Sequence, residues 1–475
     1  MIEDRRIAEW LFLLSFIVSA YFHSGGGWNQ NAQFDLTRAI VERHTFSIDA
    51  YASNTGDRSF ANGHVYANKA PALSFLAAIP YALIHAAFGT PQNALALAIA
   101  AYVCTLLTVG VFAAMVPAIL FLDARRRGID GLWAATAALT IAFATQLLPY
   151  STLMMVGVPS GALMLIALTS RNDAVAGFAA ALAATMNYLC APAVLILAIS
   201  RGRYSRFIAG AIAPLAGLAI YQRICFGSFF TNSVATTDPR FLTKGAALGV
   251  LRAPSLEALY GITISPYRGL FFFAPVLLLA LVPLVRERAI LAISIVFIAF
   301  NVCFNGWDGG FGIGARYLVP LIPLWGVALM RARPRAIVVA LAVISFAINF
   351  TAVAVDPQPS ATIPRPLTQY LVPLLVRGHF SSGVPITPPW SAATFTGHTS
   401  VNRMTHDEAI VFQRHPPASI DSEWASFNLG EPLFGAGNAR SLIPIVALLA
   451  LGVAAILAIA QRSSRASEAT APRRV

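Results

Sequence analysis

The chain has 475 residues, of which 57% are hydrophobic and only 11% are charged, and its mean hydropathy is +0.67. Soluble domains carry roughly 25% charged residues, so this composition excludes a soluble globular protein. It indicates an all-α polytopic membrane protein with about 10–13 transmembrane helices. The net charge of +12 does not indicate nucleic-acid binding, because the arginines cluster in short patches between apolar runs.

The first apolar run follows Arg5 and Arg6 and lacks a small-residue cleavage site, so we expect a retained first helix rather than a signal peptide. The cysteines lie in or beside apolar segments without close-pair spacing, which predicts neither a disulfide framework nor a metal site. They are Cys104, Cys190, Cys225 and Cys303.

Arginine patches predict which segments face the cytoplasm, because loops on that side carry an excess of Lys and Arg. We expect a cytoplasmic location for both termini and for the patches at 1–6, 125–127, 201–206, 286–288, 331–335 and 462–475. Between the patches lie the predicted spans: 7–23, 93–122, 131–149, 152–169, 205–222, 270–285, 289–304, 317–330, 336–354 and 441–461.

Two apolar stretches do not fit as single spans. The stretch 174–199 lies between two basic loops, so we expect it to enter the membrane and return as two half-crossings around 187–192. The stretch 70–88 is broken by Pro80, and a full crossing there would place the patch at 125–127 outside. We therefore expect 70–88 to dip into the outer leaflet and return without crossing.

These expectations divide the chain into four parts. A transmembrane module covers 1–354 and contains the first extracytoplasmic loop at 24–69. An extracytoplasmic loop or small domain follows over 355–440, then a last transmembrane helix over 441–461 and a cytoplasmic tail over 462–475. Within the first loop, residues 29–44 have the pattern of an amphipathic helix, in which Asp35, Arg38 and Glu42 are expected to face water.

Lys69 is the most informative residue, because the chain contains 31 Arg and only 2 Lys, the other being Lys244. An ammonium group is a compact point charge that suits a phosphate oxygen in a tight pocket, whereas a guanidinium is a planar fork. Lys69 also lies where the first loop meets an apolar run, at the depth of a lipid phosphate. The alternative is an interfacial lysine that extends its charge toward water.

Two further motifs place an arginine at the extracytoplasmic mouth of a predicted span, Arg268 within 265–273 and Arg316 within 305–317. Charged groups at such positions are costly unless they are paired or face a water-filled cavity, which favours a functional role. The glycines around Asp308 let the backbone approach a ligand closely. The alternatives are interfacial anchoring for the two arginines and an ion pair with Arg316 for Asp308.

The pattern Asn62-Gly63-x-x-Tyr66-x-x-Lys69-x-Pro71 resembles the first-loop motif of the GT-C glycosyltransferases, in the family-39-like branch of protein O-mannosyltransferases and the lipid A aminoarabinose transferase. The helix at 32–40 and the segments 265–273 and 307–317 also resemble members of this branch, so the likeness covers 1–330. It implies a GT-C-like fold with extracytoplasmic loop helices. It also implies that Lys69, helped by Arg268 or Arg316, binds the phosphate of a polyprenyl-phosphate-linked sugar.

The chain departs from that family near position 29, where the family usually carries its catalytic acid and this sequence has Asn29. A sugar transferase needs a carboxylate to accept the proton of the acceptor hydroxyl. Asp35 is narrowly favoured for this role, against Asp57, with Asp308 next in line. The alternative for Asp35 is a pair with Arg38 three residues later, and that for Asp57 is a turn residue.

Substrate contacts are expected from Asn29, Tyr66, Tyr267 and Asp308. The resemblance implies no essential metal and no cofactor, since members of this branch act without a tightly bound metal. The implied partners are a polyprenyl-phosphate-linked sugar donor, membrane lipids, and an acceptor that is a lipid, a glycan or a protein.

The expected function is therefore transfer of a sugar from a polyprenyl-phosphate donor on the extracytoplasmic face of a bacterial inner membrane. One alternative is a transporter or flippase of a lipid-linked saccharide, which would bind phosphate with the same basic residues. That alternative is weakened because no internal repeat is evident and the polar residues gather on one face. A third hypothesis is an inactive homologue, which the missing acid at position 29 favours.

Overall fold

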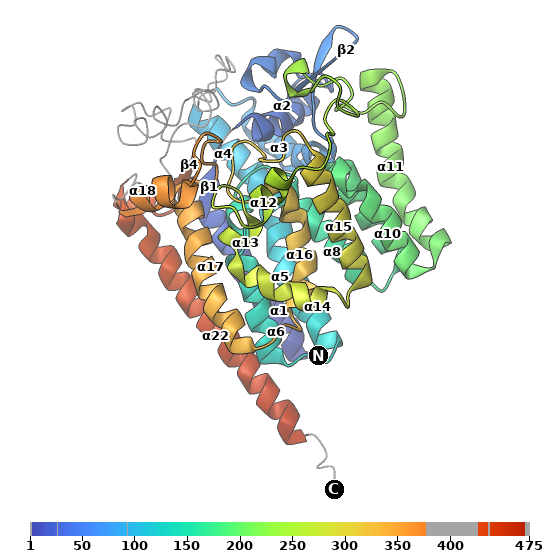
Figure 1. Cartoon of the computed structure of the whole chain (residues 1–475). Coiled ribbons are helices and arrows are strands. Elements are labelled where there is room, and N and C mark those ends of the chain that lie inside the picture. The colour runs from blue at the N-terminus through green and yellow to red at the C-terminus, as the bar shows by residue number, and fades with distance from the viewer. Residues whose placement is uncertain (1, 26, 93, 377–425, 436–437, 471–475) are drawn as a thin grey trace.

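The computed structural model describes residues 2–25, 27–92, 94–376, 426–435 and 438–470. Most of the predicted segment 355–440 and the end of the predicted tail therefore lie outside the described residues. The fold is almost entirely helical, and several long helices lie side by side (Figure 1). An all-α polytopic architecture, as the composition predicts, is confirmed.

The described helices, in chain order, are α1 (Ile2–Tyr21), α2 (Trp28–Glu42), α3 (Ala72–Phe88), α4 (Ala94–Thr105), α5 (Val111–Arg126), α6 (Gly131–Phe143), α7 (Leu147–Tyr150), α8 (Gly157–Thr169), α9 (Asp173–Met186), α10 (Ala191–Arg201), α11 (Tyr204–Phe226), α12 (Leu256–Thr263), α13 (Leu270–Phe273), α14 (Leu281–Leu284), α15 (Arg288–Cys303), α16 (Ile322–Leu329), α17 (Arg335–Val355), α18 (Val372–Val376), α21 (Glu431–Phe434) and α22 (Ile443–Thr470). Two short antiparallel sheets pair β1 (Phe22–Ser24) with β4 (Ser426–Asn428) and β2 (Arg58–Ala61) with β3 (His64–Ala67).

Four described helical stretches are long and apolar enough to cross a membrane: Ala96–Arg126, Tyr204–Phe226, Arg335–Val355 and Ala439–Ser464. Each coincides with a predicted span. Other predicted spans coincide with shorter apolar helices, among them α6, α8 and α15. The chain also breaks between α9 and α10, where the Asn187 side chain accepts a hydrogen bond from Leu189 N (3.2 Å).

Two expectations about single segments are wrong. The stretch 70–88 does not turn back within itself, because α3 is one continuous helix that accommodates Pro80 and packs along α2. The stretch 270–285 is not a single helix. It consists of α13, a 3₁₀ segment (Pro275–Ala280) and α14, because Pro275 lacks the N–H group that an unbroken α-helix requires.

The start of α1 and α14 lie toward the same end of the molecule (Figure 1). Arg125 Nε lies 2.8 Å from Asp4 Oδ1, which joins the end of α5 to the start of α1. Glu287, between α14 and α15, forms ion pairs with two arginines. Its Oε1 lies 3.3 Å from Arg127 Nη1 and 2.9 Å from Arg331 Nη1. Four of the predicted cytoplasmic patches therefore lie on one face, as the positive-inside rule requires.

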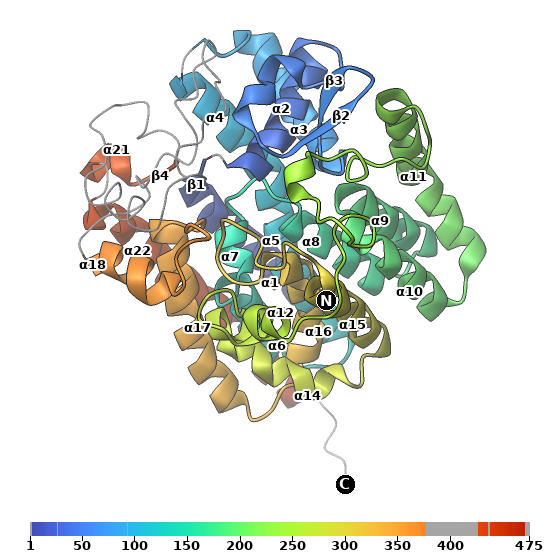
Figure 2. The ribbon, with the colours of Figure 1, turned by 45° about the horizontal axis from the view of Figure 1, so that its top comes forward.

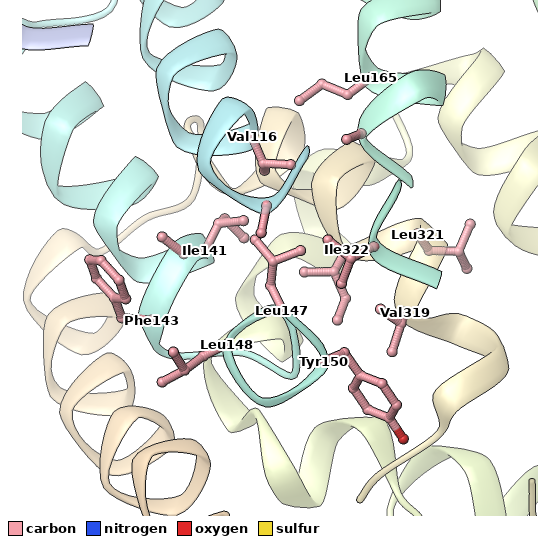
Figure 3. Packing of buried hydrophobic residues seen from close by; sticks show 14 of the residues in the cluster. Val116, Ile141, Phe143, Leu147, Leu148, Tyr150, Leu165, Val319, Leu321 and Ile322 are labelled. Atoms are coloured by element: carbon pink, nitrogen blue, oxygen red, sulfur yellow. The ribbon is translucent and has the colours of Figure 1, made fainter. Parts of the chain in front are cut away.

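The hydrophobic core lies between the long helices. Figure 3 shows part of it, where side chains of α5, α6, α7 and α8 meet Val319 and Leu321 in the 3₁₀ segment before α16 and Ile322 at the start of α16. All three of these side chains are fully buried. This packing holds the helices at fixed positions below the loops that form the opposite end.

That opposite end is formed by α2, α3 and the hairpin β2–β3 (Figure 2). Asn62 and Gly63 form the two-residue turn of the hairpin, and both have positive φ, 52° and 79°. An Asn-Gly pair is the preferred sequence for such a turn, because both central residues must adopt this conformation. The loop after α11 runs beside the hairpin, where Phe60 N donates to Thr236 O (2.9 Å) and Asp238 N to Arg58 O (2.8 Å).

Candidate functional site

A cavity of about 550 Å³ lies at the hairpin end of the molecule. Four segments that are far apart in sequence form its walls: the start of α2, the base of the hairpin, the loop before α12, and the glycine-rich loop before α16. Its charged lining residues are Lys69, Arg240, Arg252 and Arg316 against Asp57 and Asp308. Four cationic groups face two carboxylates, so the cavity favours an anionic ligand.

Lys69 and Asp57 form an ion pair in this cavity, with Nζ 2.9 Å from Oδ2. The two residues flank the ends of β2 and β3, and Asn68 N donates to Asp57 O (3.1 Å), which extends the hairpin ladder by one step. Ser233 Oγ donates to the carbonyl of Lys69 (3.3 Å) from the loop after α11. Hydrogen bonds to the main chain therefore help to position both residues independently of the ion pair.

The opposite wall carries two arginines that the sequence did not single out. Arg240 is held in a bidentate pair by Asp238 (3.0 and 2.8 Å) and lies over the Trp28 ring, 5.2 Å from its centroid. Arg252 donates to Thr243 Oγ1 (2.8 Å). Asp57 also interacts electrostatically with Arg240 and Arg316, so three cations surround this carboxylate.

The glycine-rich loop brings Arg316 to the cavity. Its glycines serve the close approach of protein groups: a Cβ at Gly309 (φ 75°) would lie 2.9 Å from the Arg316 side chain, and one at Gly312 (φ 154°) would lie 2.6 Å from Tyr150 Oη. Arg316 also donates to Tyr317 Oη (3.1 Å). Any side chain at Gly309 would displace Arg316, so the glycines first of all make room for this arginine.

Arg268, Tyr267 and Asp308 form a support for that loop. Arg268 is fully buried, is not among the cavity-lining residues, and donates to the carbonyls of Asp308 (3.2 Å) and Gly310 (2.7 Å). Tyr267 Oη donates to Ala361 O (2.6 Å) and also lies 3.2 Å from Asp308 Oδ2. Neither Arg268 nor Tyr267 reaches the cavity, which differs from their expected roles in phosphate and substrate binding, whereas Asp308 lines it.

Asp35 does not reach the cavity either. The expected water-facing side of α2 is buried against α3 and the hairpin: Asp35 is 1% and Arg38 2% exposed. Asp35 Oδ1 accepts a hydrogen bond from Asn54 (3.0 Å), while Arg38 pairs with Glu42 (2.8 Å) instead of Asp35. Burial raises the pKa of Asp35 to about 8, although the hydrogen bond from Asn54 opposes this shift.

Asp35→Asn is expected to stabilise the protein in alkaline solution and to leave turnover intact. Because the pKa of Asp35 is raised from 3.8 to about 8, its stabilising effect is complete below pH 3.8 and is lost as the pH rises through 8. Asparagine does not ionise, so the stability gained by the variant should be absent near pH 4 and should grow as the pH rises toward 8. Thermal unfolding in detergent at several pH values measures this difference.

Asp49→Asn is the matched control in the same loop. His64 Nδ1 lies 2.6 Å from Asp49 Oδ2, and Val65 N donates to Asp49 Oδ1 (2.6 Å). Although burial raises it, hydrogen bonds with Ser47, Val65 and His64 lower the net pKa of Asp49, so Asp49→Asn should lose stability above pH 4. Equal pH dependence in the two variants would contradict the assignment of a raised pKa to Asp35.

The remaining expected site residues are Asn29 and Tyr66. Asn29 lines the cavity beside Trp28, at the start of α2. Tyr66 lies on the other side of the hairpin, 7% exposed, packed against Phe226 at 5.4 Å between ring centroids. In the motif, Asn62 and Gly63 therefore form the turn, Tyr66 anchors the hairpin, Lys69 presents the charge, and Pro71 precedes α3. Only the lysine of the motif faces the cavity.

Trp28, Arg240 and Arg252 are among the cavity residues that sequence reasoning missed. Trp28 directly precedes Asn29, an expected substrate contact, so its position in the sequence could have indicated that it lies in the site. Arg240 and Arg252 lie in a long loop with no regular pattern, and only the fold reveals that this loop crosses the cavity. Among the described residues, no group of three His, Cys, Asp or Glu side chains is placed to hold a metal ion.

Two solved structures are similar to this chain, both of ArnT from Cupriavidus metallidurans. The match to the apo form has a TM-score of 0.42 and 16% sequence identity, and it covers 94% of this chain and 74% of the ArnT chain. The match to the form bound to undecaprenyl phosphate has a TM-score of 0.44 and 15% sequence identity, and it covers 96% of this chain and 75% of the ArnT chain. ArnT, a lipid A aminoarabinose transferase, belongs to the branch that the sequence motifs resemble. No family model matches the chain, and no curated protein is significantly similar to it. At these values the likeness decides nothing about activity.

Proposed function

We propose that this protein transfers a sugar from a polyprenyl-phosphate donor to an acceptor hydroxyl on the extracytoplasmic face of a bacterial inner membrane. The observation that carries the proposal is the Lys69–Asp57 pair (2.9 Å) within a cavity whose lining has an excess of cationic groups. A cation and a proton acceptor side by side are what displacement of a phosphate by a hydroxyl requires.

In this proposal the acceptor oxygen attacks the anomeric carbon in a single displacement with inversion. The bond between that carbon and the phosphate oxygen breaks, and negative charge develops on the leaving polyprenyl phosphate. Lys69 and Arg316 stabilise that charge, and a charge-assisted contact in a partly buried site is stronger than one in water. Asp57 takes the proton of the acceptor hydroxyl.

Asp57 replaces Asp35 as the favoured base. Asp57 and Asp308 line the cavity and Asp35 does not. Asp57 is paired with Lys69, so a donor phosphate that attracts the ammonium would free the carboxylate for the acceptor. Asn29, at the position of the family's acid, has an amide that cannot accept a proton in this way. Asn29 and Asp308 both line the cavity, so they are the proposed substrate contacts.

The test is release of free polyprenyl phosphate from a labelled polyprenyl-phosphate sugar by the purified protein in the presence of candidate acceptors. A flippase leaves the sugar–phosphate bond intact, so movement of label across vesicles without release would support the transporter alternative. Binding of donor with neither release nor movement would support an inactive homologue. A structure with bound polyprenyl phosphate would test whether Lys69 contacts its phosphate.

Both termini are expected to be cytoplasmic, with the cavity on the other side of the membrane. A reporter that is active only outside the cytoplasm should be silent when fused to residue 475 and active when fused within 228–255, the loop that supplies Arg240 and Arg252. A reporter inside 286–288 should be silent, because that patch joins the N-terminal end through Glu287. Activity at residue 475 would overturn this orientation.

A further inference from the structure

A second cavity, of about 560 Å³, lies at the opposite end of the molecule, where the N-terminus and the arginine patches gather. Three helices form it: the start of α1, the last two turns of α5 and the last turn of α8. Its lining residues are Asp4, Ile119, Leu122, Arg125, Arg126, Ile166, Thr169 and Ser170. The proposed reaction uses none of them.

The lining changes from apolar to polar along the helix axes. On α5, Ile119 and Leu122 come first and Arg126 follows seven residues after Ile119, about 10 Å further along the axis at ~1.5 Å per residue. On α8, Ile166 precedes Thr169 in the same direction. Both helices therefore present an apolar wall on the side toward the membrane and polar groups at its end. A phospholipid has the same order of apolar and polar parts.

Arg126 has hydrogen-bonding capacity left for a ligand. Its Nε donates to Leu122 O (3.3 Å) and its Nη2 to Asp123 (3.4 Å), both long contacts, and its side chain is 37% exposed. A guanidinium has five N–H donors, so most of them find no acceptor among the described residues. Arg125, by contrast, is fixed by Asp4 (2.8 Å) and Ile129 O (2.7 Å). Arg126 is the cation that an anionic headgroup would meet.

We propose that this second cavity binds an anionic glycerophospholipid of the inner leaflet, with the phosphate at Arg126 and an acyl chain along Ile119, Leu122 and Ile166. Basic pockets between helices at the cytoplasmic side suit anionic headgroups, and each arginine near the surface contributes about 1 kcal/mol. The phospholipid would lie in a groove between α1, α5 and α8, so its binding should stabilise the packing of these helices. The inference rests on the cytoplasmic orientation of this end and not on the transferase proposal.

The experiment measures thermal unfolding of the full chain in detergent during titration with phosphatidylglycerol, phosphatidylethanolamine, glycerol phosphate or inorganic phosphate. Phosphatidylglycerol should raise the melting temperature of the parent protein, because a ligand that binds only the folded state stabilises it. Arg126→Gln should weaken apparent binding about fivefold, the equivalent of one surface arginine. No donor sugar is present, so the result is independent of transferase activity.

Two variants control this measurement. Arg286→Gln removes an exposed arginine at the same end that does not line the cavity, so it should bind phosphatidylglycerol like the parent. Ile166→Trp keeps every charge and fills the apolar wall, so it should lose binding as Arg126→Gln does. Equal stabilisation by phosphatidylethanolamine, equal loss in Arg286→Gln, or full stabilisation by inorganic or glycerol phosphate would each overturn the proposal.

Discussion

Lys69→Ala is expected to lower turnover by about a hundredfold or more, while the protein still folds. Removing one preorganised group from a developing negative charge costs about 3 kcal/mol in other enzymes, which corresponds to this factor. Lys69→Arg should restore little, because a planar guanidinium does not fit where a compact ammonium lies 2.9 Å from Asp57. Release of polyprenyl phosphate from a labelled donor is the measurement.

Lys244 provides the matched control, because it is the only other lysine in the chain and is exposed on the loop before α12. Lys244→Ala should turn over like the parent. Lys69→Ala also leaves the largely buried Asp57 without its partner, so Lys69→Gln is needed as a second variant that keeps a hydrogen-bond donor there. Normal turnover in all Lys69 variants would return this residue to the role of an interfacial lysine.

Asp57→Asn is expected to abolish measurable turnover while donor binding persists. A positioned general base contributes roughly 10²- to 10⁴-fold, and an amide of the same shape cannot take the acceptor's proton. Asp35→Asn should retain turnover, because its carboxylate is buried among α2, α3 and Asn54 outside the cavity. Donor binding is measured separately, by retention of labelled lipid on the purified variant.

Asp308→Asn distinguishes the two carboxylates that line the cavity. If Asp57→Asn turns over normally and Asp308→Asn does not, the base is Asp308. If only Asp35→Asn is inactive, the base is Asp35, as the sequence alone favoured. Normal turnover in all three variants would contradict a carboxylate base in this site.

Much of the fold follows from sequence, because apolar runs long enough to span a bilayer must satisfy their backbone hydrogen bonds as helices. The spans at 93–122, 205–222 and 336–354 were predictable for that reason, and so was the break near Asn187, which lies between two basic loops. The behaviour of 70–88 was not, because a proline within a helix is tolerated where neighbouring groups compensate, and only packing on α2 decides this.

The site was predictable where a residue's type was itself unusual. Lys69 stands out among arginines, and Arg316 and Asp308 stand out among glycines and apolar residues. Asp35 was misplaced because periodicity assigns polar side chains to water, whereas here α2 is covered on that side as well and the Arg38–Glu42 pair is buried with it. Arg240 reaches the cavity through a loop whose course depends on backbone pairing with the hairpin, which no local pattern encodes.

The hairpin also determines which parts of the cavity are able to change shape. Asp57 and Lys69 lie at the end of one four-pair hairpin, so the separation of their backbone atoms is fixed mainly within that hairpin. The loop that carries Arg240 and Arg252 pairs with the hairpin through its backbone, whereas the glycine-rich loop that carries Arg316 is held by Arg268 and Tyr267. A ligand of different size would therefore be accommodated by displacement of the glycine-rich loop, while the hairpin keeps the backbone of Asp57 and Lys69 in place. One wall of the cavity would thus adapt to the shape of the acceptor, while the other wall positions the residues that react.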